Sequence, residues 1–501
     1  MRRMMSERLA FPGLRALGMP TALGAAMATG QAPLGLWWVT LPALAVLLRG
    51  LSRQSARQAA WSGWFAGAGY FAIALSWIVS PFLVDVARHG WMAPFALVLM
   101  SFGLALFWAA ACGLARRAQG APLLALVTGL GAAELARGYV LTGFPWALIG
   151  HVWIDTPAAQ VAALVGPSGL TLVTLAAAAL AASLRPVLIA ASVAVIAGLW
   201  GFGLWQLRQP DPAPPGVTLR LVQPNAPQEA KWDPAHAQLF FDRLMADTAA
   251  PVTLGAAKID LVIWPETALP YLVIDYPTLP ALIGAAGKGA AVVVGLQRVE
   301  GWRGWNSLQV FGPDGQVLAS YDKHHLVPFG EYIPLGDLAQ DWFGLSAFAA
   351  QNGNAYSAGP GPQVLDLGPR LGTVLPLICY EAVFPQDLRG TVRPDWLMQI
   401  TNDAWFGTIS GPFQHAAQAR LRAVEQGLPL VRVGNTGVTQ VVDARGRVTA
   451  SLPFGTAGFL DAALPGALPA TPYSRFGETP VLVLLGGLLV VILRRNRRPA
   501  A

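Results

Sequence analysis

Long, almost unbroken runs of apolar residues dominate the first 207 positions of the chain, and one more such run follows position 478. A run of about 20 apolar residues is typical of a helix that crosses a lipid bilayer. Three of the runs are short, so seven or nine spans remain alternatives to eight. The expected helices lie near residues 14–31, 34–48, 59–80, 91–115, 119–136, 158–184, 186–207 and 479–493.

Between residues 208 and 478 the pattern changes to short apolar runs that are rich in Val, Ile and Leu and are separated by turn residues. Such runs predict β-strands, and helical periodicity appears near 234–249, 278–287 and 412–427. Two hairpins with helices outside favour a layered α/β sandwich over a purely parallel sheet. Strands are expected at 217–225, 259–264, 290–297, 307–312, 316–322, 372–378, 396–401, 430–435 and 438–443.

Composition independently indicates a membrane protein, because 54% of the residues are hydrophobic and only 12% are charged. Soluble domains usually carry about 25% charged residues. We therefore expect three parts: an N-terminal transmembrane bundle of about seven helices at 1–207, an exported α/β domain at 208–478, and a C-terminal transmembrane helix with a basic tail at 479–501.

Arginine placement predicts the orientation, because cytoplasmic loops of membrane proteins carry an excess of Lys and Arg. With a cytoplasmic N-terminus, thirteen arginines fall inside and two, Arg88 and Arg137, fall outside. Both termini are then cytoplasmic and the α/β domain is exported. The formal net charge of +7 comes mostly from basic residues at the ends of the predicted membrane helices. These residues form no continuous basic surface that could bind nucleic acid. The inner arginines are Arg2, Arg3, Arg8, Arg49, Arg53, Arg57, Arg116, Arg117, Arg185, Arg494, Arg495, Arg497 and Arg498.

Cys379 is one of only two cysteines, and it follows directly on a predicted apolar strand in the run TVLPLICYEAVFP. A thiol at a strand end, open to substrate, is typical of a nucleophile in covalent acyl transfer. The alternative is a small buried hydrophobic residue, which is what most single cysteines are. Cys112 falls within the fourth predicted helix and cannot reach Cys379.

Two further predicted strands end in titratable residues. Glu266 follows IDLVIW, and Lys323 follows QVLASYD. Lysine occurs at only four positions in this arginine-rich chain, and a lysine, unlike an arginine, can be tuned to exchange a proton. Each residue alone could be a surface charge or part of a structural ion pair. Together with Cys379, they predict a base, an ammonium group and a thiol at one edge of a sheet.

The motifs WPET, YDKHHLVPFGEY, ICYE and TNDAWFG resemble those of the nitrilase (carbon-nitrogen hydrolase) superfamily, and the longer membrane forms of that family, the apolipoprotein N-acyltransferases, resemble the whole chain. The resemblance implies an α-β-β-α sandwich and a triad of Glu266, Lys323 and Cys379. It also implies a supporting role for Glu331 near Lys323, and roles in shaping the site for Asn306, Tyr380 and Glu381. Ordinary hydrogen-bonded residues at a sheet edge are the alternative for these four.

Several aromatic residues are candidates for an acyl-chain pocket. Trp342 and Phe343 lie in a Gly/Asn/Ala-rich segment at 341–359, and long loops of this kind often serve as lids or binding loops. Trp232 and Trp405 resemble family positions near the acyl pocket. Burial in the core is the alternative for each of these rings.

The sequence therefore predicts an acyltransferase of the bacterial inner membrane with its catalytic domain in the periplasm. The resemblance implies a phospholipid acyl donor, a diacylglyceryl-apolipoprotein acceptor and contact with the bilayer. A membrane-tethered amidase or nitrilase, and an inactive lipid-handling scaffold, remain alternatives. We expect no cofactor and no metal, because the six histidines lack ligand spacing and the adjacent His324 and His325 would point in different directions.

Overall fold

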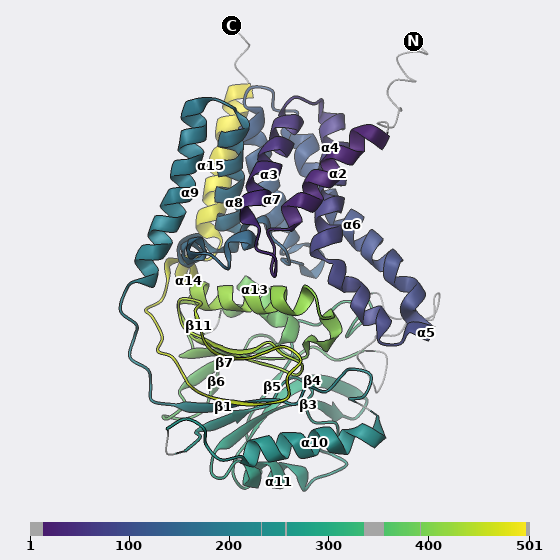
Figure 1. The fold of residues 1–501 in the computed structure, drawn as a ribbon, viewed down its shortest axis with the longest axis vertical. Helices are drawn as coiled ribbons and strands as arrows, with labels where there is room; N and C mark the ends of the chain where they lie inside the picture. Colours follow the sequence, from purple (N-terminus) through teal and green to yellow (C-terminus); the bar gives the residue numbers. More distant parts are fainter. Residues whose placement is uncertain (1–13, 232, 256–257, 335–354, 391, 497–501) are drawn as a thin grey trace. The chain divides into compact units, whose positions relative to one another are not determined.

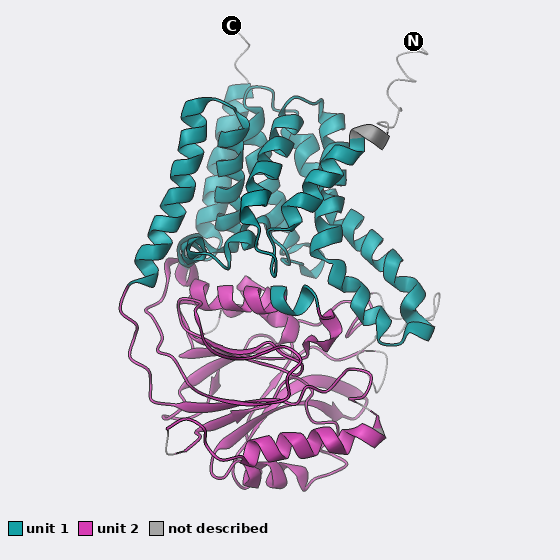
Figure 2. Cartoon of the chain, viewed as in Figure 1, with its two compact units in different colours: residues 1–208, 409–414, 476–501 teal, residues 209–408, 415–475 magenta. Residues whose placement is uncertain are grey.

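The structure, a computed structural model, describes residues 14–231, 233–255, 258–334, 355–390 and 392–496. The chain forms two compact units (Figure 2). Unit 1 contains the chain up to Arg208, the short segment Ile409–Gln414 and the C-terminal part from Phe476. Unit 2 contains Gln209–Thr408 and His415–Arg475.

Unit 1 consists of helices, and each segment that the sequence predicts to be a membrane helix is helical. Each helix satisfies its backbone N–H and C=O groups by internal hydrogen bonds and carries mostly apolar side chains, as a bilayer requires. The helices are α2 (Leu14–Ala28), α3 (Trp37–Ser52), α4 (Ala56–Ala74), η1 (Ser76–Leu83), α5 (Val86–His89), η2 (Gly90–Met92), α6 (Ala93–Ala115), α7 (Pro122–Arg137), η3 (Val140–Thr142), η4 (Ile149–Trp153), η5 (Pro157–Val161), α8 (Ala162–Ala182), α9 (Pro186–Leu207) and α15 (Thr479–Asn496).

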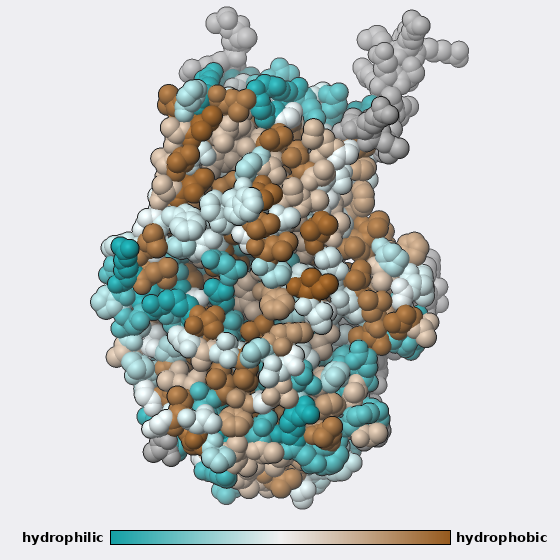
Figure 3. Space-filling view, in the orientation of Figure 1, coloured by the Kyte–Doolittle hydropathy of each residue, from teal (hydrophilic) through white to brown (hydrophobic). Residues whose placement is uncertain are grey.

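Within the described ranges, four stretches are long and apolar enough to cross a bilayer: Val86–Ala115, Pro157–Ala182, Pro186–Leu207 and Thr479–Asn496. The helix pair α4 and η1, bent by 50°, makes a fifth if it counts as one span. Hydrophobic side chains cover much of the helical surface that Figure 3 shows. Exposed apolar side chains on membrane helices face lipid rather than water, so the expected membrane bundle is confirmed, with four to five spans in the described residues in place of the eight expected.

A buried ion pair organises one end of α7. Arg137 lies 2.9 Å from Glu134 one turn earlier, and both side chains are about fully enclosed, at 0% and 1% exposure. Arg137 also donates to the carbonyl oxygens of Phe144 (2.6 Å) and Trp146 (2.8 Å). This i, i+3 pair therefore also fixes the loop that follows the helix.

Unit 2 contains two six-stranded sheets. The first has the order β12-β1-β2-β3-β4-β5 and the second the order β11-β10-β9-β8-β7-β6. In each sheet three neighbouring strands are parallel, β1 to β3 and β7 to β9, and the outer strands are antiparallel. The strands are β1 (Thr218–Gln223), β2 (Leu261–Ile263), β3 (Ala291–Glu300), β4 (Arg303–Phe311), β5 (Val317–Asp322), β6 (Leu365–Asp366), β7 (Thr373–Ile378), β8 (Trp396–Thr401), β9 (Leu430–Gly434), β10 (Thr439–Val442), β11 (Val448–Leu452) and β12 (Gly458–Ala463).

Alternating side chains on the strands build the layers, since successive strand residues face opposite sides of a sheet. Leu219 and Leu221 of β1 pack between the two sheets, whereas Val222 packs under the helices. Helices α10 (Pro234–Ala249) and α11 (Leu279–Ala286) cover the first sheet, and α13 (Gly411–Gln426) covers the second (Figure 1). The α-β-β-α sandwich that the resemblance implies is therefore confirmed.

Three strands of unit 2 were not expected from the sequence: β6, β11 and β12. β6 is only two residues long, and β11 is largely exposed at the edge of its sheet. β12 pairs with β1, although about 240 positions separate the two strands. Arg220 of β1 donates to both oxygens of Asp461 on β12, at 2.7 and 2.9 Å, so an ion pair holds the two strands together.

Candidate active site

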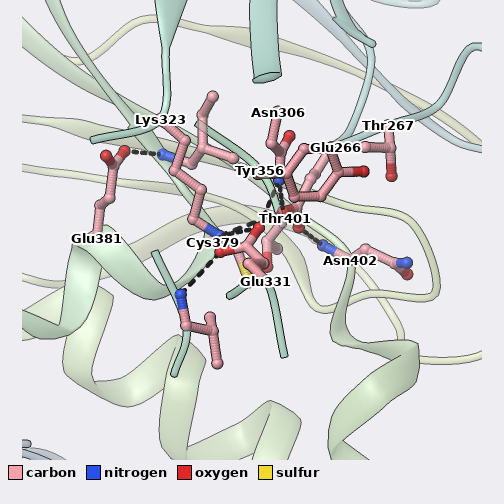
Figure 4. A network of polar contacts seen from close by, with 12 residues as sticks. Glu266, Thr267, Asn306, Lys323, Glu331, Tyr356, Cys379, Glu381, Thr401 and Asn402 are labelled. Carbon is pink, nitrogen blue, oxygen red and sulfur yellow. Dashed lines mark hydrogen bonds and ion pairs between the residues drawn. The ribbon is translucent and has the colours of Figure 1, made fainter. Parts of the chain in front are cut away.

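Three strand ends place Glu266, Lys323 and Cys379 together (Figure 4). Glu266 follows β2, Lys323 follows β5 of the same sheet, and Cys379 follows β7 of the other sheet. All three side chains are buried. The geometry therefore brings together the three residues that the sequence singles out.

Lys323 forms an ion pair with two carboxylates. Its Nζ lies 2.9 Å from the Glu331 carboxylate and 3.6 Å from Oε1 of Glu266. Burial disfavours the ammonium form, but the charges of Glu331 and Glu266 outweigh burial, so the pKa of Lys323 is raised. Lys323 is thus a permanent cation at this site.

Asn306 and Asn402 hold the carboxylate of Glu266. Nδ2 of Asn306 donates to Oε1 of Glu266 at 2.7 Å and to Oε1 of Glu331 at 3.0 Å. The backbone N–H of Asn402 donates to Oε2 of Glu266 at 2.7 Å. Asn306 is the position that the family resemblance suggests, whereas Asn402, within the motif TNDAWFG, was not predicted as a site residue.

A second buried lysine supports Glu266 from its backbone side. Nζ of Lys231 donates to the Glu266 carbonyl oxygen at 3.2 Å and to Oγ1 of Thr267 at 2.9 Å. Burial lowers the pKa of Lys231 to about 8, against the opposing effect of the Glu266 charge. Lys231 is one of the four lysines of the chain, and no role was predicted for it.

Cys379 adopts a conformation that is uncommon for a residue with a side chain. Its φ of +53° lies in the left-handed region. This conformation costs a non-glycine residue about 1–3 kcal/mol, and residues that adopt it are frequent at functional sites. The residue is only 5% exposed, so the expectation of an open sulfur is wrong for this conformation. Burial and the nearby Glu266 charge raise the pKa of the Cys379 thiol well above its ordinary value, although Lys323 and a hydrogen bond with Thr401 oppose them.

A buried polar cluster supports Cys379 on the other side. Nε2 of Gln399 and Nε2 of His415 each lie 3.0 Å from the carbonyl oxygen of Cys379. Nδ1 of His415 lies 2.9 Å from Oδ1 of Asp403, whose other oxygen pairs with Arg432. Burial lowers the pKa of His415, although the Asp403 charge and the hydrogen bonds of the ring oppose it. Sequence reasoning missed this cluster, because nothing in the spacing of its members links them.

Glu381 connects the turn at Cys379 to the segment after Lys323. Its Oε2 accepts from the backbone N–H of Ile378 at 2.7 Å, and its Oε1 accepts from the backbone N–H groups of His324 (2.8 Å) and His325 (3.2 Å). Tyr380 is buried, and its ring packs edge-on against Phe384. Glu381 thus ties the two segments together by hydrogen bonds, and Tyr380 packs beside them.

The aromatic candidates are only partly located. Trp232, Trp342 and Phe343 lie outside the described residues. Trp405 is half-buried in η8 (Asp403–Phe406), which begins directly after Asn402. Tyr356 was not predicted but is buried near the carboxylates, and its hydroxyl accepts from Gln297 at 2.6 Å.

The adjacent histidines do not point apart, contrary to expectation. Nδ1 of His325 lies 2.8 Å and Nε2 of His324 lies 3.4 Å from the same oxygen, Oδ2 of Asp387. The carboxylates of Asp387 and Glu381 overcome the effect of burial and raise the pKa of His324 to about 9. The backbone turn after Lys323 therefore gives the two rings a shared partner.

Comparisons with known proteins agree with this architecture. Residues 23–180 match the family described as apolipoprotein N-acyltransferase N-terminal domain, and residues 219–473 match carbon-nitrogen hydrolase. Apolipoprotein N-acyltransferase of Caulobacter vibrioides is 41% identical over 86% of this chain and 84% of its own. That of Rhodopseudomonas palustris is 36% identical over 95% of both chains.

Among solved structures, an amidase of the nitrilase superfamily from Nesterenkonia is 19% identical and covers 55% of this chain and 99% of its own, with a TM-score of 0.38. A CN-hydrolase superfamily protein from Xanthomonas campestris is 19% identical and covers 57% and 99%, with a TM-score of 0.36. The family matches and the identity to full-length relatives are decisive: the chain is a multi-pass membrane protein and an enzyme of the apolipoprotein N-acyltransferase family, whose second unit is a carbon-nitrogen hydrolase domain.

Proposed function

We propose that this enzyme moves an acyl chain from a phospholipid to Cys379 and then to the α-amino group of an S-diacylglyceryl cysteine at the N-terminus of an apolipoprotein. The observation that carries the proposal is the meeting of a strained, buried thiol with Lys323 and Glu266. The name of the relatives supports the acceptor, and the helical unit supports a donor that resides in a membrane.

In the first half-reaction Glu266 takes the proton of the Cys379 thiol while the sulfur attacks the ester carbonyl. A base is needed because the raised pKa keeps the resting thiol protonated. The ammonium group of Lys323, with the backbone N–H of Tyr380, stabilises the oxyanion that develops. Collapse breaks the ester bond, and Glu266 returns its proton to the alkoxide of the departing lysophospholipid.

In the second half-reaction the neutral amine of the acceptor attacks the thioester carbon. Lys323 again stabilises the oxyanion, and Glu266 accepts a proton from the attacking nitrogen. Collapse forms the amide and releases the sulfur as a thiolate, which Glu266 reprotonates. Asn306 and the backbone of Asn402 hold Glu266 in one orientation through both steps.

Glu331 positions Lys323 and does not exchange the reacting proton in this scheme. Its two oxygens accept from Lys323, from Asn306 and from the backbone N–H of Val327. A carboxylate that accepts hydrogen bonds from three donors is held in one orientation. Its role is to fix the ammonium nitrogen where the oxyanion forms.

The same triad suits a membrane-tethered amidase or nitrilase, which would release acid to water, and the fold alone suits an inactive lipid-handling scaffold. The intact set of Glu266, Lys323 and Cys379 argues against the scaffold. The match of residues 23–180 to the acyltransferase family argues against the hydrolase. The ratio of amide product to free fatty acid discriminates the transferase from the hydrolase.

We further propose that the enzyme lies in the bacterial inner membrane, with both termini in the cytoplasm and its catalytic domain in the periplasm. The domains are then 1–207, 208–478 and 479–501, and the support is the asymmetry of arginines across the expected spans. Trp232, Trp342, Phe343 and Trp405 remain predicted contributors to the acyl pocket.

The direct test is intact-protein mass spectrometry after the purified enzyme is mixed with phospholipid and no acceptor. We expect a hydroxylamine-sensitive acyl adduct in the wild type and in Cys112→Ser, and none in Cys379→Ala. Cys112 is a matched control because it too is a buried, unpaired cysteine. Adding a diacylglyceryl lipopeptide should convert the adduct to amide; turnover by Cys379→Ala would exclude the covalent route.

A further inference from the structure

His324, His325 and Asp387 form a compact group of nitrogen and oxygen donors beside the proposed active site. The two histidines follow Lys323 directly, and Asp387 lies in η7 (Pro385–Leu388). One ligand atom from each residue lies within 4.8 Å of the other two. The side chains are only 12–16% exposed, so the group lies below the surface yet within reach of solvent.

The orientation of His324 is fixed by a partner on its other nitrogen. Nδ1 of His324 lies 2.6 Å from Oε1 of Glu381 and 2.8 Å from the hydroxyl of Tyr321. Nε2 is buried, makes no hydrogen bond with another described residue and faces Asp387 at 3.4 Å. A histidine that binds a metal commonly donates its second N–H to a carboxylate, which sets the tautomer and the ring orientation.

Two of the three donor separations lie near those of a tetrahedral site. Zinc bonds of about 2.0–2.1 Å place neighbouring ligand atoms about 3.3 Å apart in a tetrahedron. The two separations to Oδ2 of Asp387 are 2.8 Å from His325 and 3.4 Å from His324, on either side of that value. The third separation, between the two ring nitrogens, is within 4.8 Å.

We propose that His324, His325 and Asp387 bind a divalent transition-metal ion of the zinc class. Two imidazoles and one carboxylate suit zinc and its neighbours rather than magnesium or calcium, which take oxygen ligands. Three protein ligands leave a fourth position for water or an external ligand. Because Glu381 bonds both to His324 and to the backbone N–H of Ile378, the ion would stiffen the turn that carries Cys379.

The competing occupant is a proton. A protonated His324 could donate one N–H to Glu381 and the other to Asp387. The three residues would then form a charged hydrogen-bonded cluster without a metal. A bound metal must displace that proton, as it does at any imidazole ligand. The experiment therefore has to distinguish an ion pair from a coordinated ion.

The test uses the full-length protein in detergent, freed of metal with a chelator, with Cys379→Ala as the background so that the thiol cannot bind the ion. We expect zinc to bind with one-to-one stoichiometry, and cobalt(II) to give the intense visible absorption of a tetrahedral site. Asp387→Asn and His325→Gln should each weaken binding by about 100-fold or more, because losing even an outer partner of a ligand costs about 10–100-fold.

His236→Gln is the matched control. His236 pairs with Asp233 at the same 2.8 Å, on an exposed helix start and without a third ligand in the described chain. Binding that is absent, or equally strong in the control and in both ligand variants, would overturn the proposal and leave the proton-bridged cluster. X-ray absorption at the zinc edge provides a readout independent of variant folding: two imidazole ligands are expected, and none or one would also overturn it.

Discussion

Nε2 of His415 lies 3.0 Å from the carbonyl oxygen of Cys379, within a cluster in which Nδ1 of the same ring contacts Asp403. The imidazole thus connects the backbone of a residue in the left-handed conformation to a carboxylate that Arg432 neutralises. All members of this cluster are fully buried. A residue held in an unfavourable conformation needs surroundings that determine it, and this cluster supplies them from behind.

We therefore predict that His415→Ala lowers kcat by about 10–100-fold, which corresponds to roughly 1.4–2.8 kcal/mol, and leaves KM unchanged. The reason is that Cys379 loses a contact that holds its turn, while the donor and acceptor sites for substrate remain. Stability should fall by about 1–3 kcal/mol, because buried polar groups lose a partner. His415→Gln, which keeps a polar group at this position, should recover part of kcat; an unchanged kcat in the alanine variant would limit His415 to a structural role.

Glu331→Gln should shift the pH dependence of acylation. In the wild type, the pKa of Lys323 is raised, so the ammonium persists to high pH and is lost only as the pH rises through that value. Removing the Glu331 charge lets burial act on Lys323 with one carboxylate fewer to oppose it. The alkaline limb of the pH–rate profile should then move to lower pH.

The rate at neutral pH should fall by about tenfold or more, less than the roughly 10²–10³-fold loss expected for a missing oxyanion donor. The side-chain NH₂ of the glutamine is itself a donor, so it would face one of the groups that now donate hydrogen bonds to Glu331. One of these hydrogen bonds would therefore be lost. Single-turnover acylation between pH 6 and 10 is the measurement. Glu300→Gln, which alters an exposed carboxylate paired with Arg298, is the control, and identical profiles for both variants would exclude the role given to Glu331.

Arg220→Ala should be among the most destabilising single changes in unit 2. Arg220 is 1% exposed, binds Asp461 through two nitrogens, and donates to carbonyl oxygens at the end of α10, including that of Ala250 at 2.6 Å. Removing one partner of a buried ion pair costs about 3–5 kcal/mol. Arg370→Ala removes a 54% exposed arginine from Asp260 and should cost about 1 kcal/mol or less, because Asp260 still accepts from the backbone N–H of Thr218.

This difference should depend on pH. Burial opposes ionisation of Asp461, but Arg220 and Thr253 outweigh it, so the pKa of Asp461 is lowered. A lowered carboxylate pKa stabilises the fold above the unfolded value of about 3.9 and the effect is lost as the pH falls through the folded value. Thermal unfolding at pH 7 and pH 3 should therefore show a gap between wild type and Arg220→Ala that narrows in acid; a constant gap would contradict the ion-pair explanation.

The arginine asymmetry predicts the orientation of the chain. A reporter fused after Arg117 should read cytoplasmic, and one fused after Gly458 should read periplasmic, because only a cytoplasmic N-terminus assigns thirteen arginines to the inner side and two to the outer. Reporter enzymes that are active in only one compartment provide the measurement. The reverse pattern would overturn both the orientation and the location proposed for Cys379.

Much of the fold follows from local patterns in the chain. Apolar runs predict the helices of unit 1, and alternating residues predict strands such as β8, for which the expected bounds 396–401 agree with the structure. The positions of Glu266, Lys323 and Cys379 at strand ends are likewise visible in the sequence, because a strand that stops at a polar residue marks the edge of a sheet. The strands β6 and β11 escape this reasoning, since a two-residue strand and a largely exposed strand bury too few side chains to create a period.

Contacts between distant segments needed the tertiary structure. No local signal connects Arg220 with Asp461, or His415 with Cys379, because each side chain alone reads as an ordinary polar residue. The burial of the Cys379 thiol and the shared contact of His324 and His325 with Asp387 also depend on how loops from two sheets meet. The sequence by itself determined the elements and the chemical groups at their ends, since both depend on local pattern; only the tertiary structure decided which groups face each other, because that depends on sheet order, register and packing across the chain.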